Sequence, residues 1–161
     1  NQGWNEKKTI SPLPFWPQGQ KMSEGEIADI IKINYPSAKN LYLYNQQTGL
    51  YQRQINEQPH LDANNQQQLA AANILVQKVS SKVLDDAGRL KIDLVGQGEA
   101  WIFSGGYAQK GNWQKDSLDS PTVFKDQNGK RWNLASGQTW IQVIDQTVKL
   151  SYENSQAGSG Q

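Results

Sequence analysis

Residues 99–115 read EAWIFSGGYAQKGNWQK, and this stretch decides the class of fold. Its two halves, 99–104 and 107–115, carry aromatic and apolar residues that are typical of strands. Between them stands Gly105-Gly106, a two-residue turn in which glycine supplies the positive φ angles that a tight hairpin needs. The stretch therefore predicts an antiparallel β-hairpin.

The same arrangement of strand segments and polar turns continues on both sides of this hairpin. Further strands are predicted at 41–44, 50–55, 74–84, 89–95, 122–125, 130–134, 138–144 and 148–152. One connecting turn contains Asn128-Gly129, which is a strong hairpin signal. Leu90, Ile92 and Leu94 alternate with charged residues, so their strand is expected to have one buried face and one wet face.

Two segments have a helical interpretation. Ser23 and Glu26 have capping-box spacing before an isoleucine-rich stretch, but Ile31 and Ile33 also alternate as in a strand over 28–35, which we favour. Residues 63–72, rich in alanine and glutamine, are predicted to form a short helix. The expected fold is mainly β, an antiparallel sandwich or partly open barrel of hairpins with one or two short helices.

The chain divides into three parts along its length. Prolines in residues 1–22 forbid a helix there and predict an extended segment. Residues 23–152 are expected to form a single β-rich domain. Residues 153–161 offer little to bury and are expected to be a flexible tail.

Composition excludes several classes of function. The 161 residues include 16 Lys and Arg against 15 Asp and Glu, which gives no electrostatic footprint for nucleic acid. The absence of cysteine excludes disulfides and thiolate metal sites within this sequence. No apolar run is long enough to span a membrane. We expect a monomer with no cofactor.

His60 is the single histidine, and Asp62 follows two residues later. In an extended segment the two side chains would share a face, and the carboxylate could orient the imidazole for general-base chemistry or metal binding. A zinc site needs a third protein ligand, and no second histidine exists, so we predict no metal site. The alternative is a turn in which Asp62 caps the helix predicted at 63–72, while His60 packs or forms a hydrogen bond.

Tryptophan and tyrosine are abundant, with six residues of each type. Four tryptophans fall on predicted strands: Trp101, Trp113, Trp132 and Trp140. Burial in the core is the ordinary position for such side chains in a small β domain. If they were exposed in a row, they would instead form a platform for sugar rings or for a partner protein.

Several sequence blocks, in this order, resemble the C-terminal domain of YerB-like lipoproteins, a family of unknown function. The blocks are GLYQR at 49–53, HLD at 60–62, ANILVQ at 72–77, GQGEA at 96–100, GNWQK at 111–115, FKD at 124–126 and GQTWI at 137–141. The resemblance implies a bacterial lipoprotein, extracytoplasmic and anchored by a lipid on a cysteine outside this sequence. The family positions that it carries over as a candidate functional surface are Tyr51, Arg53, His60, Asp62 and Asn73.

Three hypotheses for function follow. The first is an extracytoplasmic, non-enzymatic domain of a cell-envelope lipoprotein that binds an envelope protein or a cell-wall glycan. Asn and Gln, which number 13 and 21, pair well with sugar hydroxyls. The second is a hydrolase-like or metal-dependent site built around His60, Asp62 and Arg53. The third is a spacer that presents another domain.

Overall fold

The hairpin predicted at 99–115 forms the centre of the fold. The structure is a computed structural model that describes residues 13–155. In it, β10 (Gly96–Ser104) and β11 (Tyr107–Lys115) pair antiparallel in unbroken register. Gly105 and Gly106 between them have φ of 62° and 89°, as the two-residue turn requires. This prediction is confirmed.

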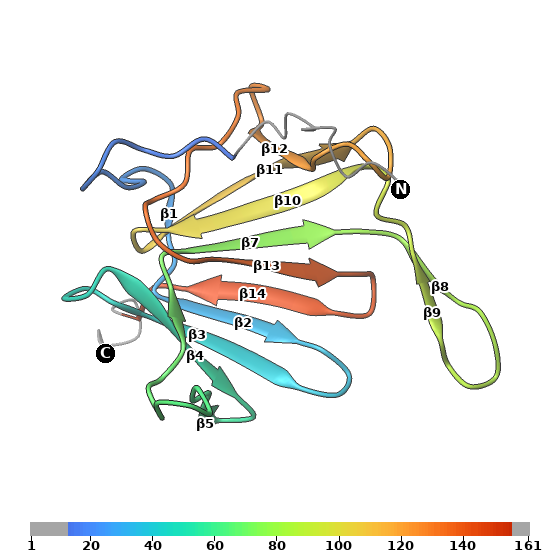
Figure 1. Ribbon diagram of the computed structural model, residues 1–161, viewed down its shortest axis with the longest axis horizontal. Helices are drawn as coiled ribbons and strands as arrows, with labels where there is room; N and C mark the ends of the chain where they lie inside the picture. Colours follow the sequence, from blue (N-terminus) through green and yellow to red (C-terminus); the bar gives the residue numbers. More distant parts are fainter. Residues whose placement is uncertain (1–12, 156–161) are drawn as a thin grey trace, which may run out of the picture.

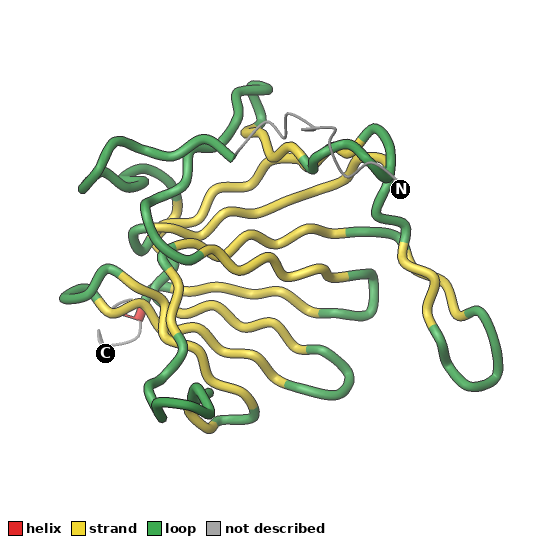
Figure 2. The backbone as a smooth tube through the Cα atoms, viewed as in Figure 1, coloured by secondary structure: helices red, strands yellow, loops and turns green. Residues whose placement is uncertain are grey.

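Strands make up nearly all of the regular structure in the described residues (Figures 1 and 2). The other strands are β1 (Glu26–Ile27), β2 (Ile30–Asn34), β3 (Lys39–Asn45), β4 (Leu50–Ile55), β5 (Gln58–Pro59), β6 (Ala70–Ala71), β7 (Asn73–Lys78), β8 (Ser81–Val83), β9 (Leu90–Ile92), β12 (Val123–Asp126), β13 (Thr139–Ile144) and β14 (Lys149–Glu153).

Two six-stranded sheets form a sandwich. Sheet I has the order β1-β11-β10-β7-β13, with β12 also paired to β11, and sheet II has the order β14-β2-β3-β4-β5, with β6 also paired to β4. All neighbours are antiparallel except β13 and β7, which run parallel. The predicted class, a mainly β sandwich, is confirmed.

The central strands of sheet I are buried on both faces. The core between the sheets contains Ile31, Tyr42, Ile74 and Phe103 among its fully buried side chains. A second core on the opposite face of sheet I packs under the N-terminal segment and the loop that precedes β13. A hydrogen bond holds the N-terminal segment on this face, since the Trp16 amide donates to the Leu134 carbonyl at 2.8 Å. Residues 1–12 of the predicted extended segment and residues 156–161 of the predicted tail lie outside the described residues. Residues 13–22 contain no helix, whereas Glu153, which the sequence assigned to the tail, is the last residue of β14.

The helix predicted at 63–72 is wrong. Asp62 Oδ1 accepts a hydrogen bond from the Asn64 amide at 2.7 Å, and Asn65 Oδ1 accepts one from the Gln67 amide at 2.8 Å. Asp and Asn side chains that bond to the backbone two residues onward compete with helix formation. Gln66 adopts φ of 58°, which breaks a right-handed helix. The segment is therefore a turn, and its end joins sheet II as β6.

The strand predicted over 74–84 breaks into β7 and β8, and β8 pairs only with β9 as a separate two-stranded ribbon. This ribbon stands away from both sheets at the right of Figure 1. Leu90, Ile92 and Leu94 are all exposed, so the expected buried face is wrong. The reason is that no sheet packs against the ribbon. We call residues 81–95 the finger.

The remaining strand predictions differ mainly in their ends. The strand at 28–35 is confirmed as β2, and the hairpin of 41–44 with 50–55 is confirmed as β3 and β4. The turn at Asn128-Gly129 forms, with the Gly129 amide donating to the Asp126 carbonyl at 3.1 Å. Residues 130–134, however, form only two isolated bridges, Arg131 with Lys125 and Leu134 with Phe15, and Trp132 and Leu134 pack into the second core.

Gly111 allows β12 to lie against β11. A Cβ at position 111 would overlap the Lys125 carbonyl oxygen and lie 2.7 Å from Trp132 Cζ2. Gly111→Ala is expected to lower the free energy of unfolding by about 1–3 kcal/mol because the backbone of β12 must shift. Chemical denaturation measures this, with Asn112→Ala as a control whose exposed side chain should matter by less than about 0.5 kcal/mol. Equal effects of the two variants would contradict the packing role.

Candidate functional site

Arg53 and Trp140 meet where β4 of sheet II faces β13 of sheet I. The Arg53 guanidinium carbon lies 4.4 Å from the centroid of the Trp140 ring, in a cation–π contact. Arg53 Nη2 donates to Asn40 Oδ1 at 3.1 Å, and Arg53 Nη1 is 3.1 Å from His60 Nδ1. Strand pairing places Arg53 beside Tyr42, whose ring packs edge-on against Trp140. We call Arg53, Asn40, His60 and Trp140 the Arg53 cluster.

The contact with Arg53 fixes the tautomer of His60. A guanidinium has only donors, so His60 Nδ1 must accept and the proton lies on Nε2. Burial raises the pKa of the Tyr35 hydroxyl beside the cluster, and the positive charge of Arg53 opposes that rise. The cluster is therefore a half-buried, positively charged site with a neutral imidazole at its edge.

Asp62 does not join the cluster. Its carboxylate accepts a hydrogen bond from the Asn64 amide in the turn after His60, so the alternative is confirmed for the turn, but the helix that Asp62 was expected to cap does not form. The structure thus brings His60 and Arg53 together, but the carboxylate of Asp62, the third residue of the expected site, lies outside the cluster. Among residues 13–155, no group of three His, Cys, Asp or Glu side chains could hold a metal ion.

Tyr51 and Asn73 lie wholly inside the protein. The Tyr51 hydroxyl donates to the Ala28 carbonyl at 3.1 Å, and burial raises its pKa strongly. Asn73 Nδ2 donates to the Ala135 carbonyl at 2.9 Å, while Asn73 Oδ1 accepts from the Ala135 amide at 2.9 Å. Both side chains hold the core together and present nothing to a ligand at the surface.

The four tryptophans do not form an exposed row. Trp113 and Trp132 are only 2% and 6% exposed and belong to the second core. Trp101 and Trp140 are partly buried against the core between the sheets. Lys110 Nζ lies 5.3 Å from the centroid of the Trp101 ring and covers it. A flat aromatic platform is therefore absent among these four residues.

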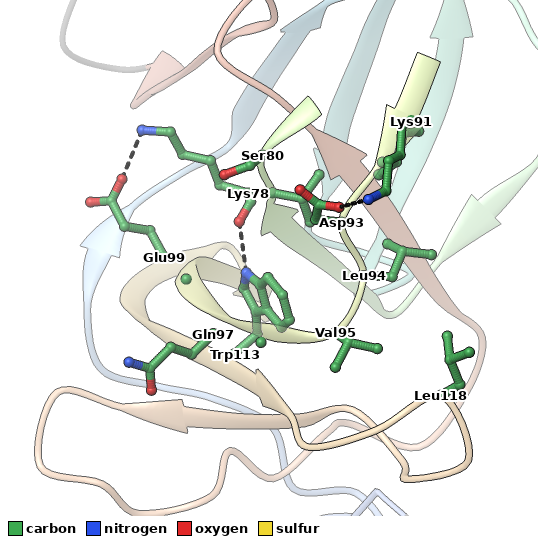
Figure 3. Close-up of a pocket in the computed structure, with 14 residues that line it drawn as sticks. Lys78, Ser80, Lys91, Asp93, Leu94, Val95, Gln97, Glu99, Trp113 and Leu118 are labelled. Atoms are coloured by element: carbon green, nitrogen blue, oxygen red, sulfur yellow. Dashed lines mark hydrogen bonds and ion pairs between the residues drawn. The ribbon is translucent and has the colours of Figure 1, made fainter. Parts of the chain in front are cut away.

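A groove of about 640 Å³ opens between the base of the finger and sheet I (Figure 3). Its apolar lining consists of Val79, Ile92, Leu94, Val95, Trp113 and Leu118. Leu118, in the loop after β11, is 82% exposed, and Figure 3 shows it beside Val95. We call this cavity the finger groove.

The finger continues this apolar surface away from the body. Six of the large exposed apolar side chains of the described residues lie on it: Val83, Leu84, Leu90, Ile92, Leu94 and Val95. Exposed apolar side chains that occur singly are ordinary, whereas a contiguous group marks an interaction surface. Sequence reasoning missed this surface because it assigned the apolar face of the ribbon to the core. No local signal distinguished the two cases, because the alternation that marks an apolar face is the same whether the core or a partner covers it.

The charges at the rim of the finger groove neutralise one another. Lys78 Nζ lies 2.8 Å from Glu99 Oε2, and Lys91 Nζ lies 3.6 Å from Asp93 Oδ1 (Figure 3). Lys110 also pairs with Glu99. Hydrogen bonds from Lys110 and Lys78 lower the pKa of Glu99 to about 2. The rim therefore offers little unpaired charge to a ligand.

Hydrogen bonds hold the base of the finger in place. Trp113 Nε1 donates to the Lys78 carbonyl at 2.7 Å, and the Asp93 amide donates to the Ser80 carbonyl at 3.0 Å. The Ser81 hydroxyl donates to Asp145 Oδ2, while the Thr147 amide donates to Asp145 Oδ1 at 2.8 Å. The bonds from Ser81 and Thr147 hold the pKa of Asp145 below its usual value.

Asp145→Asn is expected to weaken the base of the finger. Because the pKa of Asp145 is lower in the folded state, its contribution is fully present above the ordinary value of 3.8 and is lost as pH falls through the lower value. The variant should lose about 1.5–3 kcal/mol of unfolding free energy near neutral pH, which is typical of hydrogen bonds to charged groups. Denaturation at pH 7 and pH 2.5 tests this. A difference between variant and wild type that does not shrink in acid would contradict it.

Comparisons with known proteins support a relationship to one family. The family described as "Protein of unknown function (DUF3048) C-terminal domain" matches residues 31–141. "Putative lipoprotein YerB" of Bacillus subtilis (strain 168) is 23% identical over 144 residues, which are 88% of this chain and 43% of that protein. The crystal structure of Bacillus subtilis YerB superposes with a TM-score of 0.68 at 22% identity, over 87% of this chain and 47% of that chain. The chain thus spans less than half the length of these relatives. The described residues contain no helix long and apolar enough to cross a membrane.

Proposed function

This chain belongs to the DUF3048 C-terminal domain family, and from that premise we propose that it is an extracytoplasmic binding module of a bacterial envelope lipoprotein. Its partner is a protein, which binds through the finger and the finger groove. The observation that carries this proposal is the exposed apolar surface that runs from the paired Val83 and Leu90 on the finger, through Ile92 and Leu94, to Leu118 beside the groove.

A protein suits this surface better than a glycan does. The side chains exposed on the finger are aliphatic, and the aromatic residue of the groove, Trp113, is 2% exposed. Sugar rings stack on exposed aromatic faces, whereas aliphatic side chains gain by burial against other apolar side chains. Burying one Val, Leu or Ile contributes about 1.5–3 kcal/mol. Several such residues together can offset the entropy lost on association, which is on the order of 4–15 kcal/mol.

Charge also argues for an uncharged protein surface as the partner and against a bilayer. Residues 81–95 contain three basic and three acidic side chains, and the rim pairs Lys78 with Glu99. Attachment to anionic lipid requires an excess of Lys and Arg, and residues at the membrane interface are enriched in Trp and Tyr. The finger has neither feature. A complementary partner therefore presents apolar side chains with little net charge.

The hydrolase-like alternative has less support. It requires His60, Asp62 and Arg53 to converge with a further acid, and the carboxylate of Asp62 bonds instead to the Asn64 amide. A neutral imidazole whose Nδ1 is bonded to Arg53 has no carboxylate to orient it as a general base. The contacts of the Arg53 cluster suit binding rather than proton transfer.

Photo-crosslinking in the native organism tests the proposal. p-Benzoylphenylalanine replaces Leu118 in the groove and, as a control, Ile141, which is 47% exposed on β13. The expected result is one discrete protein adduct from position 118 and none from position 141. Adducts to lipid or glycan alone from position 118, or the same protein from both positions, would reject the finger groove as a protein-binding site.

A further inference from the structure

Arg53 has no ion-pair partner in the part of the chain that the structure describes. Among residues 13–155, no carboxylate lies within 4.0 Å of its guanidinium, although the side chain is half-buried against Asn40, His60 and Trp140. Buried and half-buried charges are normally paired because removal from water is unfavourable. Arg89 on the exposed finger, by contrast, pairs with Asp85 at 2.6 Å.

The guanidinium also has unused donors. Arg53 has five N–H groups, of which one contacts His60 Nδ1 and one donates to Asn40 Oδ1. Arg53 Nε is buried with no hydrogen-bond partner. Because Nε is closed to solvent, the donors that remain for a ligand are the second N–H groups of Nη1 and Nη2. The Nε2–H of His60 adds a neutral donor to the half-buried edge of the cluster.

The stacking on Trp140 organises these donors in advance. The ring holds the guanidinium at 4.4 Å, and Asn40 and His60 fix its rotation from two sides. Arginine binds carboxylates through two parallel hydrogen bonds, and a guanidinium fixed beforehand loses little entropy on binding. We propose that the Arg53 cluster is a binding site for a carboxylate group, supplied by a peptide terminus or by an acidic sugar. This site is separate from the finger groove, so it stands or fails independently of the proposed function.

Titration followed by NMR tests this site. The ¹⁵N-labelled protein is titrated with N-acetylglycine, with glucuronate and with neutral N-acetylglycinamide, while the Arg53 Nε–H and Trp140 indole N–H signals are followed. We expect saturable shifts with at least one of the two carboxylates at millimolar concentration and none with the amide. Which carboxylate binds more tightly distinguishes a peptide source from a sugar source.

Variants make the test specific. Arg53→Met keeps an aliphatic chain against Trp140 and is expected to weaken carboxylate affinity at least tenfold. Arg53→Lys keeps the positive charge but lacks the paired N–H groups of a guanidinium, and it should fold even if Arg53→Met does not. It is expected to bind carboxylates at least threefold more weakly than wild type. Arg89→Met removes an exposed arginine and should bind like wild type. No saturable shift with either carboxylate, or affinity unchanged in both Arg53 variants, would overturn the proposal.

Discussion

Asn73→Ala is expected to lower the free energy of unfolding by about 2–6 kcal/mol. The Asn73 side chain is fully buried and bonds to both the amide and the carbonyl of Ala135, so truncation leaves two backbone groups without partners. Each unsatisfied buried group costs about 1–3 kcal/mol. These bonds also hold the loop that returns the chain to sheet I, where β13 pairs parallel with β7. Urea denaturation followed by circular dichroism measures the loss.

Thr139→Val is the matched control for this prediction. Thr139 Oγ1 accepts from Asn73 Nδ2 at 3.0 Å, and its removal leaves the two bonds to Ala135 in place. The expected loss is about 0.5–1.5 kcal/mol, as for one ordinary hydrogen bond. If Asn73→Ala and Thr139→Val were equally stable, Asn73 would not hold the loop.

The double variant Leu94→Asp, Leu118→Asp is expected to weaken partner binding about 100-fold or more. Both side chains line the finger groove, and burying one leucine contributes about 1.5–3 kcal/mol. Two leucines thus contribute about 3–6 kcal/mol, and each 1.4 kcal/mol is about tenfold in affinity. Charged aspartates would in addition have to leave water. The measurement is the affinity of each variant for the purified partner protein, which is the protein crosslinked at position 118.

The free energy of unfolding distinguishes a loss of partner binding from misfolding of the double variant. Leu94 and Leu118 are 43% and 82% exposed, so the double variant should unfold within about 1 kcal/mol of wild type. Ile141→Asp introduces the same charge at an exposed site outside the groove and should bind the partner normally. Normal binding by the groove variant, or equal loss in Ile141→Asp, would contradict the role of the groove.

Local signals in the sequence predicted much of the fold. Gly105-Gly106 and Asn128-Gly129 mark turns whose backbone geometry depends on residues adjacent in the chain. The parallel pairing of β13 with β7 has no such local signal, since it depends on Asn73 binding a loop 62 residues away. The incorrect helix at 63–72 has a different cause, because the side chains of Asp62 and Asn65 bond to the backbone two residues onward and these local bonds outweighed the helical propensity of the alanines.

The candidate sites were predictable to different degrees. His60 and Arg53 could be singled out by residue type and resemblance, but Trp140 joins them only because the two sheets face each other. The finger groove was not predictable, since alternation of Leu90, Ile92 and Leu94 indicates a buried face without saying what buries it. Neither sheet covers that face in this chain, and we propose that the partner protein covers it.

The most direct test of the central claim is whether the finger groove is covered in the cell envelope. Because the sequence has no cysteine, Leu118→Cys and Ile141→Cys each give a single reactive site in this domain. The rate of maleimide labelling is measured in purified protein, with protein-free vesicles and in isolated envelopes. Labelling at least tenfold slower at position 118 in envelopes alone, with position 141 unchanged, is the predicted result. Equal rates at position 118 in purified protein and in envelopes, or protection by vesicles alone, would contradict the account.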